Sequence, residues 1–282
     1  MILAVASGKG GTGKTTVCVN LAQVYGSHVQ LLDCDVEEPN CHIFLKPKIH
    51  RIHAVGVPIP VVDEAICTAC GECSGFCQYH AIVSLKSKVL VFPELCHGCG
   101  GCARVCPAGA IREVQHEIGT VQIGPAGAVE FIQGQLNVGE ARPGPLIRAV
   151  KRYAGKTGVT IIDSPPGTSC PVIAAIQGSD YVVLVTEPTP FGLHDLKLAV
   201  EMVRELRIPF GVVVNRMGIG DDRVQVFCRR EDIPILVEIP DDRRIAEAYS
   251  RGSLIVEALP EYRSLFEGLW EKTMGLRKVA EV

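Results

Sequence analysis

A duplicated cysteine motif constrains the fold of this 282-residue chain more than any other feature. Each copy has the pattern C-x2-C-x2-C-x3-C, and the second copy begins 29 residues after the first. The alanine–isoleucine pair that follows each copy repeats with the same offset. Two copies of one unit predict a small module with pseudo-twofold symmetry. The cysteines are Cys67, Cys70, Cys73 and Cys77 in the first copy and Cys96, Cys99, Cys102 and Cys106 in the second.

This spacing is typical of bacterial ferredoxins that carry two [4Fe–4S] clusters. Three closely spaced thiolates bind one cluster, and the fourth cysteine of each copy ligates the other cluster. Zinc is the alternative metal, but zinc ribbons usually join two separated C-x2-C pairs instead of using four cysteines in a single run. A second alternative is that the metal only stabilises a small domain that could not fold alone. The spacing predicts one cluster on Cys67, Cys70, Cys73 and Cys106 and another on Cys96, Cys99, Cys102 and Cys77.

The rest of the composition is that of a soluble protein. The chain has thirteen cysteines and opens on an apolar run without basic residues, which favours metal binding over disulfides and a strand over a signal peptide. Its net charge is −3, and its apolar runs are too short to cross a membrane. The apolar positions near the C-terminus predict a helix that packs on the domain. We therefore expect a cytoplasmic protein that binds no nucleic acid and does not insert stably into a membrane.

A glycine-rich segment follows the first predicted strand and precedes a predicted helix. Residues 8–16 have the sequence GKGGTGKTT, which satisfies the P-loop pattern G-x4-G-K-[ST]. In such a loop backbone N–H groups surround phosphate oxygens, the lysine contacts the β- and γ-phosphates, and the following hydroxyl binds Mg²⁺. The residues predicted to bind nucleotide here are Gly10, Gly11, Thr12, Gly13, Lys14, Thr15 and Thr16.

Outside the cysteine repeat, short apolar runs alternate with helical patterns. The runs are rich in valine and isoleucine without polar alternation, which is typical of strands buried on both faces of a parallel sheet. The alternation predicts a doubly wound α/β P-loop NTPase with a mostly parallel sheet, whose ligand lies beyond the carboxyl ends of the strands. The expected strands are residues 2–6, 29–32, 159–162, 181–185, 210–214 and 235–239, and the expected helices include 14–25 and 193–206.

The cysteine repeat interrupts this alternation. Residues 60–118 are expected to form an inserted ferredoxin-like α+β domain with two clusters. The ATPase domain then comprises residues 1–59 and 119–282. The flanks at 55–60 and 119–127 are rich in glycine and proline, as domain boundaries tend to be.

A second lysine, Lys9, lies near the start of the P-loop. In this feature the chain resembles the MinD/ParA/nitrogenase-iron-protein superfamily of ATPases, which share a deviant Walker A motif. The resemblance implies that Lys9 acts in catalysis by reaching the nucleotide of a partner subunit. It therefore also implies an ATP-dependent homodimer, or a heterodimer with a paralogue.

Further segments match landmarks of the same superfamily. Residues 31–40 look like its first switch, in which Asp35 positions or deprotonates the attacking water, Asp33 holds the Mg²⁺ shell, and Asn40 ends the segment. Residues 161–167 look like the Walker B strand and second switch, which implies that Asp163 coordinates Mg²⁺ and that Gly167 senses the γ-phosphate. The resemblance assigns adenine contacts to Asn215 and Pro240.

Together these motifs predict a protein that couples Mg-ATP hydrolysis to electron transfer through two [4Fe–4S] clusters toward a redox partner. An ATP-dependent iron–sulfur assembly or carrier protein is the main alternative, although carriers of this superfamily have a C-x2-C near the C-terminus that this chain lacks. A MinD/ParA-type positioning ATPase would leave the cysteines unexplained. An amidotransferring synthetase would need a glutaminase region.

Overall fold

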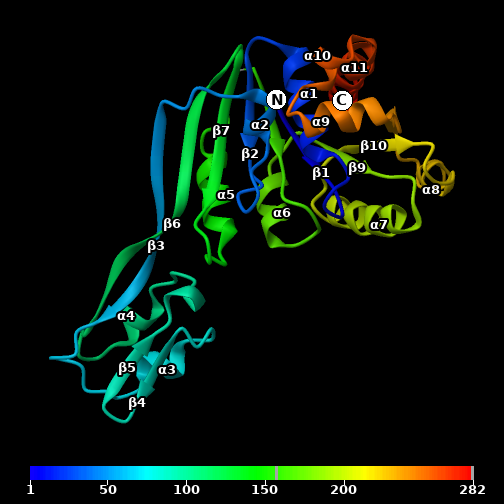
Figure 1. The fold of residues 1–282 in the computed structure, drawn as a ribbon. Coiled ribbons are helices and arrows are strands. Elements are labelled where there is room, and N and C mark those ends of the chain that lie inside the picture. The colour runs from blue at the N-terminus through cyan, green and yellow to red at the C-terminus, as the bar shows by residue number, and fades with distance from the viewer. Residues whose placement is uncertain (156–157, 281–282) are drawn as a thin grey trace.

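The computed structural model describes residues 1–155 and 158–280 of the chain (Figure 1). In this part of the chain, a nine-stranded sheet has the order β11-β10-β9-β1-β8-β2-β7-β6-β3. The strands from β11 to β7 are parallel, and β6 and β3 are antiparallel to their neighbours. The strands are β1 (Ile2–Ala6), β2 (Val29–Asp33), β3 (Arg51–Val62), β6 (Ile111–Ala126), β7 (Val129–Leu136), β8 (Val159–Asp163), β9 (Tyr181–Thr186), β10 (Phe210–Met217) and β11 (Ile235–Pro240).

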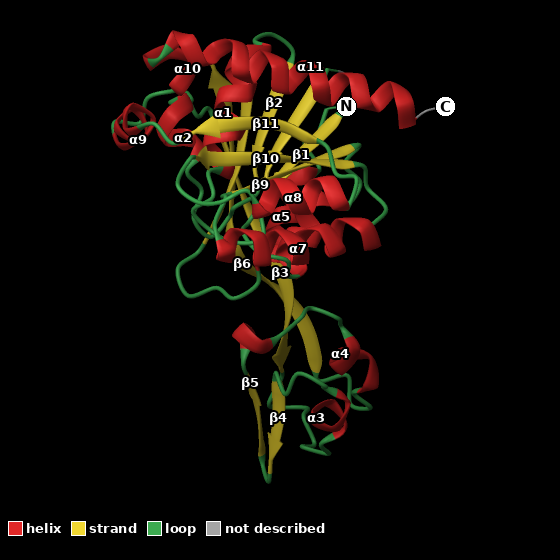
Figure 2. Ribbon diagram, turned by 90° about the vertical axis from the view of Figure 1, so that its right-hand side faces the viewer, coloured by secondary structure: helices red, strands yellow, loops and turns green. Residues whose placement is uncertain are grey.

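Helices cover both faces of this sheet (Figure 2). Alternate residues of β1 belong to different cores, because Leu3 and Val5 pack on one face while Ala4 and Ala6 pack on the other. This double burial explains the unbroken apolar runs, so the expected α/β fold with a mostly parallel sheet is confirmed. On the face of Leu3 lie α1 (Lys14–Tyr25), α2 (Cys41–Leu45), α9 (Arg243–Ser250), α10 (Ile255–Ala258) and α11 (Arg263–Ala280). On the other lie α5 (Pro143–Lys151), α6 (Cys170–Ile176), α7 (Pro190–Glu205) and α8 (Arg223–Arg230).

The helix α11 packs against α1, and its Phe266 and Leu269 are fully buried. The predicted packing of the C-terminal helix on the domain is therefore observed. Among the described helices, none combines the length and the apolar composition that crossing a membrane requires.

The parallel strands bring three predicted site segments to one edge of the sheet. The P-loop follows β1, and Asp33 and Asp163 are the last residues of β2 and β8. The two strands are hydrogen-bonded in a register that places Asp33 beside Asp163. A ligand site is expected at this edge, because the carboxyl ends of parallel strands meet there.

The strands β3 and β6 extend beyond the main sheet as a two-stranded ribbon (Figures 1 and 2). They pair from Arg51 opposite Ile123 to Val62 opposite Ile111, whereas β7 pairs with the Gly119–Ala126 part of β6. The ribbon carries residues 63–110 at its far end, and we term this unit the cysteine module. It contains α3 (Glu72–Phe76), β4 (Ile82–Leu85), β5 (Lys88–Val91), a 3₁₀ turn at Pro93–Leu95 and α4 (Gly101–Val105).

The glycine- and proline-rich flanks of the cysteine repeat are strands. Residue 60 lies within β3 and residue 118 within β6, so both predicted boundaries fall inside the ribbon. Because β3 is an edge strand, it tolerates Pro58 and Pro60, which cannot donate hydrogen bonds to a second neighbour. The division of the chain at 60 and 118 stays a prediction.

Candidate functional site

The P-loop lies between β1 and the N-terminus of α1, as its sequence predicts. Gly13 has a φ of 98°, a conformation that favours glycine. A Cβ atom there would lie 2.4 Å from Nδ2 of Asn215. That amide donates a hydrogen bond of 2.8 Å to the carbonyl oxygen of Thr12. Asn215, near the end of β10, therefore packs directly on the P-loop, and its contact with adenine stays a prediction.

A cavity of about 380 Å³ opens in front of this loop. It is bounded by the P-loop, the predicted first switch and the ends of β10 and β11, and its size suits a small-molecule ligand. Thr12 belongs to the loop but does not line the cavity; its side chain is buried, with no hydrogen-bond partner for its Oγ1 among the described residues. The predicted residues that line the cavity are Gly10, Gly11, Gly13, Lys14, Thr15, Thr16, Asp35, Asn40, Asn215 and Pro240. They are joined by Glu38, Pro166, Arg216, Asp241, Asp242, Ile245, Ala246 and Tyr249.

The structure brings together the hydroxyl and the carboxylate predicted to hold Mg²⁺. Oγ1 of Thr15 donates a hydrogen bond of 2.6 Å to Oδ2 of Asp163. The second oxygen, Oδ1, is buried without a partner in the described part of the chain. Burial raises the pKa of this carboxyl, so the ionised form needs a nearby cation. Mg²⁺ prefers oxygen ligands of these kinds, so the pair fits the metal.

Asp33 has a different set of contacts. Its buried carboxylate accepts hydrogen bonds from the backbone N–H groups of Asp35, Asn40 and Cys41, at 3.2, 3.1 and 3.0 Å. These bonds fold the segment of residues 33–40 and start α2. Burial and the neighbouring charge of Asp163 raise the pKa of Asp33. Its predicted place in the Mg²⁺ shell stays a prediction, while its contacts here are those of a residue that organises the switch.

Asp35 faces the cavity, and this predicts a pH dependence. Burial first, and then the charge of Asp163, raise the pKa of Asp35 to about 7. A base works only as the carboxylate, so we expect kcat/KM for ATP hydrolysis to rise with pH and to reach half its limit near pH 7. The measurement is phosphate release between pH 5.5 and 9. Asp35→Asn should remove the activity, and Glu38→Gln, which removes a charge that raises the pKa of Asp35, should keep the activity and move the midpoint to lower pH. A wild-type profile that is flat across pH 7 would contradict this role.

Lys9 forms an ion pair outside the cavity lining. Its Nζ lies 3.3 Å from Oε2 of Glu187, and Nη1 of Arg216 lies 3.0 Å from Oε1 of the same carboxylate. Glu187 is almost buried just after β9. Sequence reasoning missed it because no motif surrounds it. The predicted role of Lys9 in a partner's site stays a prediction.

The predicted second switch lies against the strand that precedes the P-loop. Gly167 has a φ of 96°, and its N–H donates a hydrogen bond of 2.9 Å to the carbonyl oxygen of Ser7. This contact attaches the segment after β8 to the first residue beyond β1. A displacement of Gly167 would therefore change a hydrogen bond to Ser7, the residue that directly precedes the P-loop.

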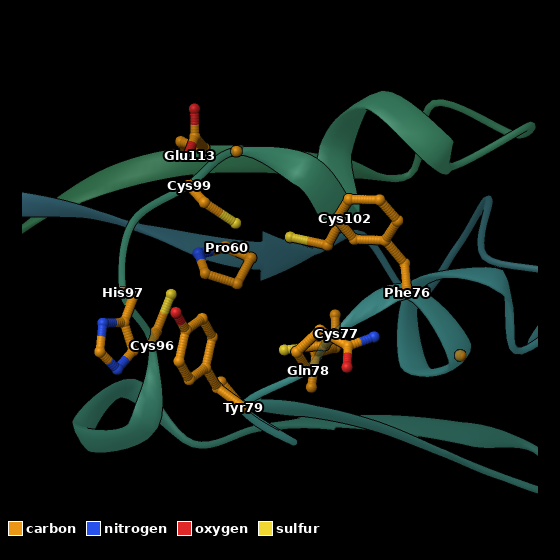
Figure 3. Close-up of a pocket in the computed structure, with 14 residues that line it drawn as sticks. Pro60, Phe76, Cys77, Gln78, Tyr79, Cys96, His97, Cys99, Cys102 and Glu113 are labelled. Carbon is orange, nitrogen blue, oxygen red and sulfur yellow. The ribbon is translucent and has the colours of Figure 1, made fainter.

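Four of the module's cysteines line one cavity, of about 340 Å³. Figure 3 shows their thiols converging, with Phe76 and Pro60 beside them and the stacked rings of Tyr79 and His97 along one wall. The N–H of Gly98 points at Sγ of Cys96 over 3.4 Å. The four are Cys77, Cys96, Cys99 and Cys102.

The other four cysteines line a second, narrower cavity. Its walls include the apolar side chains of Val62, Val89 and Ile111, and the N–H of Ala110 points at Sγ of Cys106 over 3.3 Å. These four are Cys67, Cys70, Cys73 and Cys106. The fold thus exchanges Cys77 and Cys106 between the copies, as the spacing predicts.

The donor chemistry of the two sets fits iron–sulfur clusters. Each set offers four thiols, and backbone N–H groups approach the sulfurs, as they do around such clusters. Burial raises the pKa of Cys102 to about 11, so a metal must displace its proton to bind. Four thiols also suit zinc, and the metal itself is part of the proposal below.

The sequence of the chain is similar to that of known proteins. The CobQ/CobB/MinD/ParA nucleotide binding domain matches residues 3–255. An uncharacterized protein of Methanocaldococcus jannaschii is 32% identical over 258 residues, which cover 89% of this chain and 90% of that protein. An iron-sulfur cluster carrier protein of Pyrococcus horikoshii is 25% identical, over 98% of this chain and 86% of the carrier.

The fold itself has solved counterparts. The septum site-determining protein MinD of Pyrococcus horikoshii, complexed with Mg-ADP, superposes with a TM-score of 0.61 at 20% identity, covering 98% of each chain. The residues that match the family, 3–255, include the P-loop, both predicted switches and Asn215. The chain therefore belongs to the CobQ/CobB/MinD/ParA family of nucleotide-binding proteins.

Proposed function

We propose that this protein binds and hydrolyses Mg-ATP and uses its nucleotide state to control electron transfer through two [4Fe–4S] clusters to a redox partner. The observation that carries the proposal is the arrangement of eight cysteines in two sets of four, each around its own cavity, on a module joined to a nucleotide-binding domain. When bound, such clusters supply one-electron transfer. Cys67, Cys70, Cys73 and Cys106 would hold one, and Cys77, Cys96, Cys99 and Cys102 the other.

The residues of the nucleotide cavity have distinct roles in hydrolysis. Lys14, at the start of α1, neutralises charge on the β- and γ-phosphates together with the positive end of the helix. Thr15 and Asp163 hold Mg²⁺. Asp35 orients the attacking water and accepts its proton, for which a pKa near neutrality is suited.

The switch segment converts the presence of the γ-phosphate into a structural change. Its backbone is held by the hydrogen bonds that the N–H groups of Asp35 and Asn40 donate to Asp33, and the same two residues line the cavity. Contacts with the γ-phosphate hold such segments in one arrangement, and hydrolysis releases them. Lys9, a third exposed in the single chain, would leave Glu187 to reach the nucleotide of a second copy in an ATP-dependent dimer.

The second candidate function is an ATP-dependent iron–sulfur cluster carrier. It is favoured by the relatives named iron-sulfur cluster carrier proteins, at 24–26% identity. A carrier must release its clusters, whereas an electron-transfer protein must retain them. The two functions therefore differ in what ATP does to the iron content of the module.

The deciding experiment is an anaerobic potentiometric titration followed by EPR, with and without Mg-ATP. For a one-electron couple, about 59 mV corresponds to a tenfold change in equilibrium. A shift of that order, absent in Lys14→Ala, would support gated electron transfer. Loss of iron from the protein on adding Mg-ATP would favour the carrier. Clusters that neither shift nor leave would refute the proposed coupling.

A further inference from the structure

The end of β7 contacts the nucleotide switch, and the loop that joins β7 to α5 contacts the cysteine module. We term residues 137–142 the bridging loop; in Figure 1 it faces the module from below β7 and α5. Immediately before it, the N–H of Leu136 donates a hydrogen bond of 2.8 Å to the carbonyl oxygen of Val36. Val36 lies in the switch segment and is 1% exposed.

Val36 packs tightly against β7 just before the loop begins. A Cβ atom on Gly134 would lie 2.5 Å from Cγ1 of Val36 and 2.9 Å from Cγ2 of Val150, so the switch packs directly on the backbone of β7. Close-packed interiors transmit displacements instead of absorbing them. A movement of Val36 must therefore move the end of β7.

The other end of the loop reaches the cysteine module through Arg142. Nη1 of this side chain donates a hydrogen bond of 2.7 Å to the carbonyl oxygen of Cys96, and Nη2 donates one of 2.6 Å to Oε2 of Glu140. Both side chains are more than nine-tenths buried. The hydrogen bond from Arg142 lowers the pKa of Glu140, so the pair stays ionised. A paired guanidinium is held in one orientation, which gives the bond to Cys96 a defined direction.

The first residue of the loop is attached to the ribbon. The N–H of Asn137 donates a hydrogen bond of 2.9 Å to the carbonyl oxygen of Ile118, and its amide Nδ2 donates one of 3.2 Å to that of Glu117. Nε2 of His116 lies 3.6 Å from Glu140. Direct contacts thus run without interruption from Val36 to Cys96.

We propose that Arg142 is a positioning residue that transmits the state of the nucleotide switch to the backbone around Cys96. This inference rests on the proposed function and specifies how the site formed by Cys77, Cys96, Cys99 and Cys102 is regulated. Rearrangement of residues 33–40 around the γ-phosphate moves the end of β7, and Arg142 then approaches or leaves the Cys96 carbonyl. The bond places a positive charge beside the site, which favours its more negative state. Weakening the bond therefore lowers the reduction potential at that site.

The test is hydrogen–deuterium exchange of the full-length protein without nucleotide, with Mg-ADP and with Mg-AMPPNP. In wild type we expect Mg-AMPPNP to change the exchange rate of amides 95–99 as well as that of the switch segment. Arg142→Gln should lose the change at 95–99 and keep the change at the switch. Arg148→Gln, at an exposed arginine of α5, the helix that follows the bridging loop, should behave as wild type. Arg142→Lys keeps the positive charge but lacks the planar set of N–H donors of the guanidinium, and it should recover part of the response.

Two results would overturn the inference. One is a wild type in which the switch responds to Mg-AMPPNP while amides 95–99 do not. The other is an Arg142→Gln protein, folded by circular dichroism, in which amides 95–99 still respond. If Arg142→Gln unfolds, Glu140→Gln, which weakens the same pair without removing the guanidinium, should reduce the response instead.

The same samples separate this inference from the proposed function. Iron content, ATP turnover and the reduction potential of the site that contains Cys96 are measured on the same samples as hydrogen–deuterium exchange. Wild-type protein without iron or without turnover would refute the proposed function, whatever the exchange shows. Normal iron, turnover and ATP-dependent potential together with an unchanged Arg142→Gln response would refute only the role of Arg142. Loss of the nucleotide-dependent change in potential at the site of Cys96 in Arg142→Gln, while the switch still responds, is the result that a purely structural role would not produce.

Discussion

Replacing Lys14 with alanine is expected to reduce ATP hydrolysis at least about 100-fold, the loss typical of removing one group that stabilises charge in a transition state. Lys14 begins α1, lines the cavity and is 6% exposed. In the proposed function its ammonium group is the cation that the P-loop presents to the β- and γ-phosphates. Phosphate release would measure the loss of turnover, and the binding of a fluorescent ATP analogue would measure the loss of nucleotide affinity.

The controls for Lys14→Ala use the separation of the two sites. Lys86→Ala removes an exposed lysine at the tip of the β4–β5 hairpin and should leave turnover unchanged. The iron content of Lys14→Ala should equal that of wild type, because the cysteine cavities share no residue with the nucleotide cavity. Normal turnover in a folded Lys14→Ala protein would remove the basis for assigning an ATPase.

Replacing Cys77 with serine is expected to remove the cluster assigned to the second cysteine copy, although Cys77 belongs to the first copy in sequence. In the fold Cys77 lines the cavity of Cys96, Cys99 and Cys102. Loss of one of two [4Fe–4S] clusters lowers the iron content from about eight to about four atoms per chain. Anaerobic iron analysis and EPR of the reduced protein would measure it.

Double substitutions show which cluster is lost. Cys77→Ser combined with Cys96→Ser changes two residues of one cavity and should still leave about four iron atoms, whereas Cys77→Ser combined with Cys73→Ser changes both cavities and should leave almost none. Cys228→Ser, at a buried cysteine of α8, should retain both clusters. The reverse pattern would show that each copy binds its own cluster. Zinc in place of iron throughout would refute the clusters.

The central sheet could be predicted because its strands are buried on both faces. Their unbroken apolar runs place β1, β2, β8, β9, β10 and β11 within a few residues of the observed bounds. The ribbon could not be found in this way. Its module-side half is paired along one edge only, so β3 accommodates Pro58 and Pro60 there, and prolines are residues that a sequence pattern assigns to a boundary and not to a strand. The sequence signals of an ordinary domain boundary are in this chain those of an edge ribbon.

The candidate site was predictable where its residues are neighbours in sequence. The P-loop and the cysteine runs carry their geometry in their spacing, including the exchange of Cys77 and Cys106 between cavities. Glu187 and Arg142 were not predictable, because their partners lie far away along the chain. Glu187 meets Lys9, and Arg142 meets Cys96, only after the sheet has assembled.

The hydrogen bond from Arg142 to Cys96 also has a consequence for the nucleotide site. Free-energy coupling between two sites is reciprocal: a factor by which ATP changes an equilibrium at the module is the factor by which that equilibrium changes the affinity for ATP. A protein whose cysteine module is reduced would therefore bind ATP, in its nucleotide cavity, with a dissociation constant different from that of the oxidised protein. Through this single bond, the availability of electrons would set how much nucleotide the protein holds.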